Sequence, residues 1–204
     1  MSVHFYCYDL QEPPGPAPSF PPKFQLRCWR PDSDGYPPAG RRSISNHFWW
    51  ALTKVRGFAQ AGFTELRVER EGRLLHRLIV TPAWYRFPFM TKDDLQIGHV
   101  WTSPEARREQ LARAAIIEAH HRFGRAGGRF WYVTDATNVA SGALARSCGY
   151  RLVATGHRTR RLGLRLLGQY LITHWVQRAE TDTQATAPDC GEESGAGRTL
   201  RVSH

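Results

Sequence analysis

One junction near the middle of the chain constrains its fold more than any other feature. Residues 95–101 (LQIGHVW) have the apolar-rich pattern of a strand, and residues 106–124 carry apolar side chains at helical spacing. The stretch TSPEARREQLARA (102–114) joins the two patterns. The first turn of a helix leaves backbone N–H groups unpaired, and the helix dipole adds partial positive charge there. We therefore expect this junction either to bind an anion or to be an ordinary helix start, with Ser103 as the cap and Pro104 in the first helical position.

The other elements alternate around this junction. Two strand patterns flank Glu71-Gly72 and are typical of a β-hairpin. The helix at 106–124 lies between two strand patterns, so we expect it to be the crossover that joins two parallel strands. The sequence therefore predicts a mixed α/β fold. The expected elements are strands at 24–29, 63–70, 73–80, 95–101, 128–136, 150–159 and 165–175 and helices at 43–61, 106–124 and 138–148.

Size and composition fit a single globular domain. The 204 residues are 41% hydrophobic and 23% charged, and they are too few for two ordinary domains with linkers. We divide the chain into a proline-rich N-terminal segment (1–42) with one short strand, a folded domain (43–178) and a polar tail (179–204) that we expect to be disordered. No apolar run is long enough to span a bilayer, and we see no secretory leader.

Charge and cysteine usage narrow the partners. The net charge of +10 favours an anionic partner, although arginine-rich codon usage would give the same excess. The four cysteines are scattered and form no CxxC pair, which argues against a zinc site and a disulfide framework and favours a reduced cytoplasmic setting. Nucleic-acid binding rests on the charge alone, because the arginines are spread through the chain and no binding motif appears.

Two stretches together resemble one enzyme family. The segment VWTSPEARREQLARA resembles the pyrophosphate-binding loop of the GNAT superfamily of acyl-CoA-dependent N-acetyltransferases, which has the form R/Q-x-x-G-x-G/A between a strand and a helix. Arg107 takes the first position and Ala112 the last, but Gln110 stands in place of the first glycine. Downstream, TNVASGALARSCGYRL is similar to the second signature of the family and matches it in register at Asn138, Ser141, Leu144, Gly149 and Tyr150. The resemblance covers residues 43–175.

The resemblance implies a fold and an acyl donor. Its fold is a mixed, mostly antiparallel sheet flanked by helices, with a central pair of parallel strands that splay apart and hold the pantetheine arm of acyl-CoA between them. The matching segments are Gly98–Thr102 and Phe130–Thr134. The co-substrate is then acetyl-CoA or another acyl-CoA, and no metal is expected. Asn138 has a second reading as a simple helix cap. The implied contacts with the donor are Val100, Trp101, Thr102, Arg107, Arg108, Gln110, Leu111, Ala112, Arg113, Asn138 and Ser141.

Acyl transfer to an amine requires a group that accepts a proton from the acceptor. His99 lies in the strand before the junction and is our candidate base, because imidazole titrates near neutral pH. His76 is a second candidate. The position of a catalytic carboxylate in the family falls near Gln96, and Asp94 shares its face of the strand. A core or surface histidine remains the alternative interpretation of both His99 and His76.

The family also predicts an acid that this chain lacks. Many members carry a tyrosine that protonates the leaving thiolate, and Ala145 stands at that position here. We expect Tyr150, Tyr132 or a water molecule to replace it, or the thiolate to leave without an acid. The adjacent His120 and His121 cannot share a face of a helix as metal ligands, and we expect both to be solvated. Five tryptophans are expected either in the core or in an acyl or sugar pocket, namely Trp49, Trp50, Trp84, Trp101 and Trp131.

The sequence thus predicts an enzyme that moves an acyl group from acyl-CoA to an amine of a small metabolite. An amino sugar or a nucleotide-linked sugar is the leading acceptor, since MTKDDLQIGHVWT also resembles bacterial acyltransferases of surface polysaccharide synthesis, and aminoacyl-tRNA would also suit the charge. Gln110 and Ala145 motivate the main alternative, a GNAT-shaped CoA-binding or regulatory module without turnover. The oligomeric state stays open, with a homodimer as one option.

Overall fold

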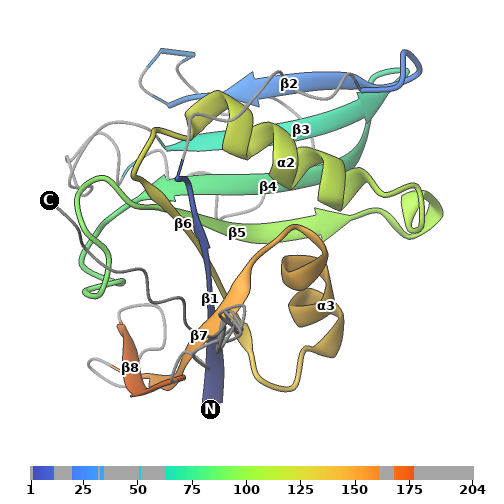
Figure 1. The fold of residues 1–204 in the computed structure, drawn as a ribbon. Helices are drawn as coiled ribbons and strands as arrows, with labels where there is room; N and C mark the ends of the chain where they lie inside the picture. Colours follow the sequence, from blue (N-terminus) through green and yellow to red (C-terminus); the bar gives the residue numbers. More distant parts are fainter. Residues whose placement is uncertain are drawn as a thin grey trace, which may run out of the picture.

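A computed structural model describes residues 2–11, 20–31, 33–34, 51, 63–160 and 168–176, and the structural statements below concern these residues. They form one eight-stranded sheet with two α-helices and one short 3-10 turn (Figure 1). Apart from Ala51, the helix expected at 43–61 lies outside the described residues, as do Trp49, Trp50 and the tail 179–204. The elements are β1 (Ser2–Asp9), β2 (Gln25–Trp29), β3 (Thr64–Arg70), β4 (Arg73–Pro82), β5 (Leu95–Thr102), η1 (Pro104–Ala106), α2 (Leu111–Phe123), β6 (Arg129–Asp135), α3 (Val139–Ser147), β7 (Arg151–Arg158) and β8 (Tyr170–Trp175).

The strand order confirms the mixed α/β fold. The sheet runs β2-β3-β4-β5-β6-β1-β7-β8, and every neighbouring pair is antiparallel except β5 and β6. Helix α2 is the crossover between these two parallel strands, as the sequence predicts. The hairpin around Glu71-Gly72 and the closing pair β7–β8 are also confirmed. No helix within the described residues is long and apolar enough to cross a bilayer.

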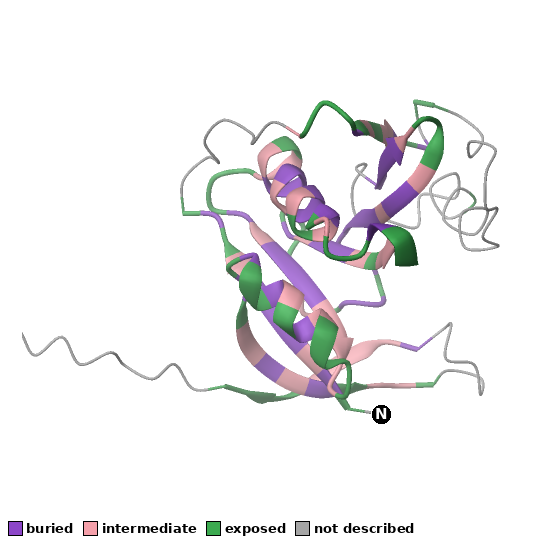
Figure 2. Cartoon of the chain, turned by 90° about the vertical axis from the view of Figure 1, so that its right-hand side faces the viewer, coloured by how far each residue is buried: buried purple, intermediate pink, exposed green. Residues whose placement is uncertain are grey.

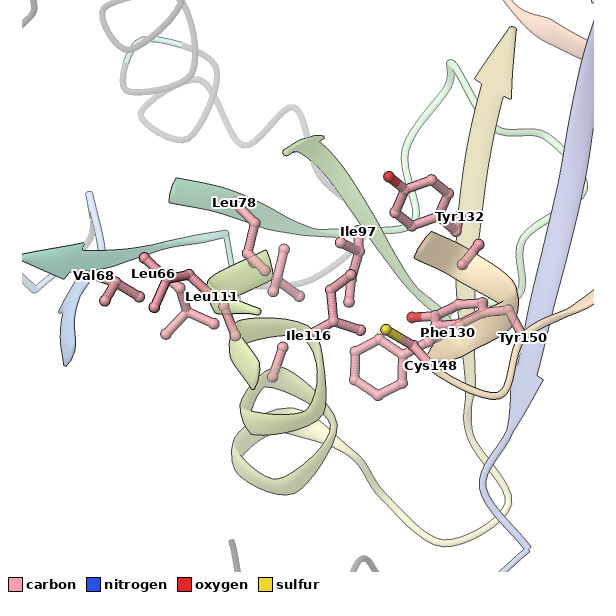
Figure 3. Packing of buried hydrophobic residues seen from close by; sticks show 14 of the residues in the cluster. Leu66, Val68, Leu78, Ile97, Leu111, Ile116, Phe130, Tyr132, Cys148 and Tyr150 are labelled. Carbon is pink, nitrogen blue, oxygen red and sulfur yellow. The ribbon is translucent and has the colours of Figure 1, made fainter. Parts of the chain in front are cut away.

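The core lies on both faces of the sheet. Helix α2 packs on β3, β4 and β5, where Leu66, Leu78, Ile97, Ile116 and Phe130 form the centre of the largest apolar cluster (Figure 3). Buried positions follow the strands and the sheet-facing sides of the helices (Figure 2). The opposite face carries two smaller clusters, made of Trp29, Phe63, Ile79, Trp84 and Phe87 and of Val3, Phe5, Cys7, Trp131 and Ala154. Trp84 and Trp131 are therefore core residues.

Strand β1 is the element that the sequence analysis did not anticipate. We assigned no structure to Ser2–Asp9 and placed it in the proline-rich segment, but it lies inside the sheet between β6 and β7. Its side chains alternate between the two core faces: Val3 and Phe5 are buried on one side and Tyr6 on the other. Because both faces of β1 are covered, its central residues Phe5, Tyr6 and Cys7 are all buried, and the strand lacks the polar and apolar alternation by which half-buried strands are found.

Candidate functional site

The parallel strands β5 and β6 are paired for only three residues each. Leu95, Gln96 and Ile97 stand opposite Phe130, Trp131 and Tyr132, and the pairing then ends. Beyond Ile97, β5 continues along β4, whereas β6 continues beyond Tyr132 along β1 (Figure 1). Within the described residues, Gly98–Thr102 and Val133–Asp135 thus have no strand partner on the sides that face each other. The splay expected from the resemblance is present, but it opens at Val133 and not at Phe130.

A β-bulge interrupts β5 at the start of this gap. Arg77 pairs with Trp101 and Ile79 pairs with Gly98, so the two residues His99 and Val100 stand opposite Leu78 alone. His99 adopts the left-handed conformation, with φ of 51°. Bulges and left-handed non-glycine residues carry a conformational cost and concentrate at functional sites. Because of the bulge, the peptide group between His99 and Val100 is not part of the regular hydrogen-bond ladder with β4.

The loop between β5 and α2 does not have the simple helix start that Ser103 and Pro104 suggested. These residues begin the separate 3-10 turn η1, and α2 begins only at Leu111, so the helix predicted at 106–124 starts five residues late. Arg108 and Gln110 both adopt left-handed conformations, with φ of 77° and 59°. Gln110 therefore has the backbone geometry for which the family uses glycine at this position.

The start of α2 leaves hydrogen-bond donors unused. Gln110 occupies the N-cap position, and its side chain makes no capping bond. The first helical bond at this end is donated by Ala114 N to Gln110 O. In the part of the chain that the structure describes, the N–H groups of Leu111, Ala112 and Arg113 have no bonded acceptor. Three adjacent amides at the positive end of a helix form an arrangement that binds anions.

The charged side chains of the loop add to this effect. Arg107 and Arg108 are exposed, and neither pairs with a carboxylate among the described residues. Glu109, the acid nearest to them in sequence, pairs with Lys23 at 2.9 Å and Arg70 at 3.7 Å. Its negative charge is thereby partly neutralised. The local electrostatics consequently favour a negatively charged ligand.

Strand β4 makes hydrogen bonds with the start of the loop. Ser103 N donates to Leu75 O at 2.8 Å, and His76 Nδ1 lies 2.8 Å from Thr102 Oγ1. His76 is fully buried, and desolvation lowers its pKa to about 4. It is therefore a neutral anchor of the Thr102–Ser103 step, which corrects its interpretation as a candidate base.

The second motif of the resemblance lies at the start of α3. Asn138 Oδ1 accepts a hydrogen bond from Ser141 N at 3.1 Å, so Asn138 is the N-cap of this helix. Among the described residues its side-chain NH2 group has no bonded acceptor, so a contact with a ligand is compatible with capping. Ser141 Oγ lies 3.2 Å from the hydroxyl of Tyr132, the last residue of β6 that pairs with β5. The α3 motif thus contacts the point where the gap opens.

Tyr150, the candidate acid, lies in the core. Its side chain is 2% exposed, its hydroxyl lies 2.8 Å from His120 Nε2, and burial raises its pKa well above the usual value. His120 is itself buried and stacked on Tyr8, with ring centroids 4.3 Å apart. The prediction that His120 is solvated is therefore wrong. Desolvation lowers its pKa to about 4, so it stays neutral.

The polar residues at the paired end of β5 are engaged with the protein. Gln96 Oε1 accepts from Thr81 Oγ1 at 2.9 Å, and Gln96 Nε2 donates to Ile97 O at 2.7 Å. Asp94 is 1% exposed and accepts hydrogen bonds from Thr91 N, Arg129 Nε and Trp131 Nε1. Because Asp94 links the start of β5 to the start of β6, it holds the closed end of the splay together.

His99 is the titratable residue at the bulge itself. The residue is exposed to solvent, but the surrounding protein removes part of the hydration of its ring, and this desolvation, followed by the charge of Arg77, lowers its pKa below the usual value. A lowered pKa keeps the imidazole neutral near pH 7 and able to accept a proton. No group of three or more His, Cys, Asp and Glu residues with metal-binding geometry occurs among the described residues.

Solved structures share this architecture. A Drosophila protein and a GCN5-related N-acetyltransferase from Sphaerobacter thermophilus each match 76% of the chain with a TM-score of 0.51 and 18% identity, over 48% and 49% of their own lengths. A tandem GNAT protein from the clavulanic acid biosynthesis pathway matches 74% of the chain with a TM-score of 0.50 and 14% identity, over 50% of its length. No family model and no curated protein matches the sequence. The chain spans about half the length of these structures and has the fold of GCN5-related N-acetyltransferases.

Proposed function

We propose that this chain transfers an acetyl or other acyl group from acyl-CoA to an amine of a small metabolite. The observation that carries the proposal is a pair of regions, joined by the loop 103–110, in which the described backbone lacks its regular strand or helix partner. The first is the gap between β5 and β6, and the second is the uncapped start of α2. One extended ligand with amides in its arm and a pyrophosphate at its end would satisfy both regions together.

The residues of these two regions fit acyl-CoA. The strand backbone of Val100, Trp101 and Thr102 would bond the pantetheine amides as a neighbouring strand would. The amides of Leu111, Ala112 and Arg113 would receive the pyrophosphate, and the exposed guanidinium groups of Arg107 and Arg108 would add charge-assisted hydrogen bonds. Asn138 and Ser141 would contact the arm from α3.

The chemistry follows from what lies at the bulge. The acceptor nitrogen attacks the thioester carbonyl, the C–S bond breaks, and the amine loses one proton. His99 would accept this proton, because it is neutral and exposed at the bulge. A backbone N–H of the bulge would stabilise the charge that develops on the carbonyl oxygen. We assign protonation of the leaving thiolate to Tyr132 in preference to Tyr150, because the Tyr150 hydroxyl is bonded to His120 in the core.

Calorimetric titration with CoA and acetyl-CoA tests the proposal, with ATP and short DNA as comparison ligands. Replacing Arg107 and Arg108 by alanine should weaken CoA binding by about 100-fold, because two hydrogen bonds to a charged group are lost. The matched control is Arg125→Ala, an exposed arginine outside the loop that should leave affinity unchanged. If CoA does not bind the wild-type protein, the function is wrong. Tighter binding of DNA would favour the nucleic-acid alternative.

A catalytically silent CoA-binding module is the second candidate. It is favoured by Ala145, which is fully buried in the core where many family members place a tyrosine, and by Gln110, whose side chain stands where the motif has glycine. Release of free CoA from acetyl-CoA, with and without amines, separates the two candidates. The acceptor panel starts with amino sugars and nucleotide-linked amino sugars, which would also test the proposed link to surface polysaccharide synthesis. Sedimentation of the same sample tests the homodimer.

A further inference from the structure

Three arginines lie in one row across the sheet. Arg27 on β2 stands directly opposite Arg67 on β3, Arg67 stands opposite Arg77 on β4, and the row ends at Trp101 on β5. Like charges directly opposite each other on neighbouring strands destabilise a sheet. Such a row therefore requires negative charge nearby.

The carboxylates near this row neutralise only part of it. Glu69 lies 3.3 Å from Arg27 Nε and 3.2 Å from Arg67 Nε, so it serves both of these arginines. Glu65 is the counter-charge for Arg77, but its Oε1 lies 4.0 Å from Arg77 Nη1, too far for a hydrogen bond. Among the described residues, three guanidinium groups thus face two carboxylates, and Arg77 is the arginine of the row whose carboxylate lies farthest from it.

Arg77 is largely buried, and its guanidinium N–H donors make no hydrogen bond with the described residues. Its side chain is 22% exposed. A guanidinium group carries five N–H donors in a planar fork that matches the two oxygens of a carboxylate or phosphate. Because this fork is partly withdrawn from water, an anion bound there would be held more strongly than at an exposed arginine.

The location of Arg77 connects it to the proposed reaction site. It pairs with Trp101 immediately beyond the bulge, and its charge acts on His99 strongly enough to contribute to the lowered pKa of that histidine. A group bound by Arg77 would therefore lie next to the candidate base. The ring of Trp101 is half-buried beside it and provides a flat apolar surface.

We infer that Arg77 binds an anionic oxygen group of the acceptor, so that the substrate is an amine that also carries a carboxylate or a phosphate. This inference rests on the proposed function and specifies its acceptor. The Arg77 fork would pair with the anion in a bidentate manner, and the amine of the same molecule would be directed toward His99. A neutral amine lacks this anchor and would bind weakly.

Matched acceptor pairs test the inference. Glucosamine 6-phosphate is compared with glucosamine, and a panel of amino acids is compared with their amides, which separates phosphate from carboxylate recognition. With the wild-type protein, one anionic member should be preferred over its neutral partner in kcat/KM. Arg77→Gln should raise KM for that anionic acceptor by about 10-fold to 100-fold and leave the neutral partner unchanged. Arg77→Lys, which keeps the charge and loses the fork, should give an intermediate result.

The control variant is Arg27→Gln. It removes another arginine of the same row, but this side chain is 65% exposed. Arg27 lies on β2, two strands away from Arg77, and pairs with Glu69 on β3. The variant should alter neither KM. Equal activity on charged and neutral acceptors, or an equal loss on both in Arg77→Gln, would overturn the inference. CoA titration of Arg77→Gln confirms that the variant is folded and should match wild type.

Failure of the proposed function can be distinguished from failure of the anion site. If the proposed function fails, the wild-type protein would not bind CoA, and the anion site would be tested by direct titration with glucosamine 6-phosphate and with the amino acid panel in the absence of CoA. Binding that is lost in Arg77→Gln and kept in Arg27→Gln would support the anion site by itself. No binding of either anion class would reject it.

Discussion

The described helices α2 and α3 begin in opposite ways. At α3, Asn138 accepts a hydrogen bond from Ser141 N and satisfies one of the free donors of the first turn. At α2, Gln110 takes the same position in a left-handed conformation, and its side chain caps nothing. An asparagine-type cap stabilises a helix, whereas a left-handed glutamine costs free energy. Stability alone would therefore favour the α3 arrangement at the start of both helices. The uncapped start of α2 supports the proposal that a ligand accepts hydrogen bonds from its free N–H groups.

Two of the described histidines are buried, His76 on β4 and His120 within α2, and acid should affect both. Desolvation lowers the pKa of His76 and His120 from 6.5 to about 4. In the unfolded chain both take up protons as the pH falls below 6.5, whereas the folded protein keeps them neutral down to about pH 4. The unfolding free energy should thus decrease over this range, by up to about 3 kcal/mol per histidine. Urea denaturation at several pH values measures the effect.

Two variants divide this acid effect between the two histidines. His76→Gln and His120→Gln should each remove about half of the pH dependence. Only His76→Gln should also weaken CoA binding, because His76 holds Thr102 ahead of α2. A pH dependence that persists unchanged in both variants would show that other groups cause it.

Proline substitution separates the two helix starts directly. Ala112 and Ala140 occupy the same second position of α2 and α3. Proline is tolerated in a first turn and removes one N–H group. Ala112→Pro should weaken CoA binding by about 10-fold to 100-fold, because a hydrogen bond to a charged phosphate is lost, while Ala140→Pro should leave it unchanged. Equal effects of the two variants would mean that the α2 amides do not contact the ligand.

The sequence predicted those parts of the fold that have clear local patterns. The β3–β4 hairpin, β5 and the crossover helix each follow alternation or helical spacing, which local burial dictates. Strand β1 was missed because it is buried on both faces at its centre, without a clear alternation, and precedes a proline-rich stretch. The Ser-Pro-Glu sequence suggested the start of α2, but the same residues suit a 3-10 turn equally well, and η1 forms there.

The candidate site was only partly accessible to sequence reasoning. The loop could be found because a motif marks it, and its left-handed residues explain why that motif contains glycine. His120 was misread because its environment comes from Tyr8 and Tyr150, which are distant in sequence. Arg77 gave no signal at all, because its role depends on cross-strand register and on a 4.0 Å separation from Glu65. Such properties are set by tertiary pairing and not by local pattern.

Removing the cap should distinguish the helices by stability. Asn138→Ala should lower the unfolding free energy by about 1 kcal/mol, because Ser141 N loses its acceptor. Gln110→Ala removes no capping bond and should change stability by only a few tenths of that amount. Thermal and urea unfolding measure both. A comparable loss in Gln110→Ala would indicate that its side chain stabilises α2 after all.

Glycine at the N-cap of α2 gives the smallest and most diagnostic effect. Gln110→Gly removes the left-handed penalty of about 1 kcal/mol, but the greater freedom of glycine in the unfolded chain offsets much of it. We therefore expect a small net stabilisation and a CoA affinity that is a few-fold tighter, since no Cβ then restricts the approach of a phosphate to the backbone. The matched change Asn138→Gly at α3 should leave stability nearly unchanged or slightly reduced and should give no gain in affinity. Weaker CoA binding by Gln110→Gly would mean that the Gln110 side chain itself donates to the ligand, and this position would then be a specific feature of the chain and not a tolerated departure from the motif.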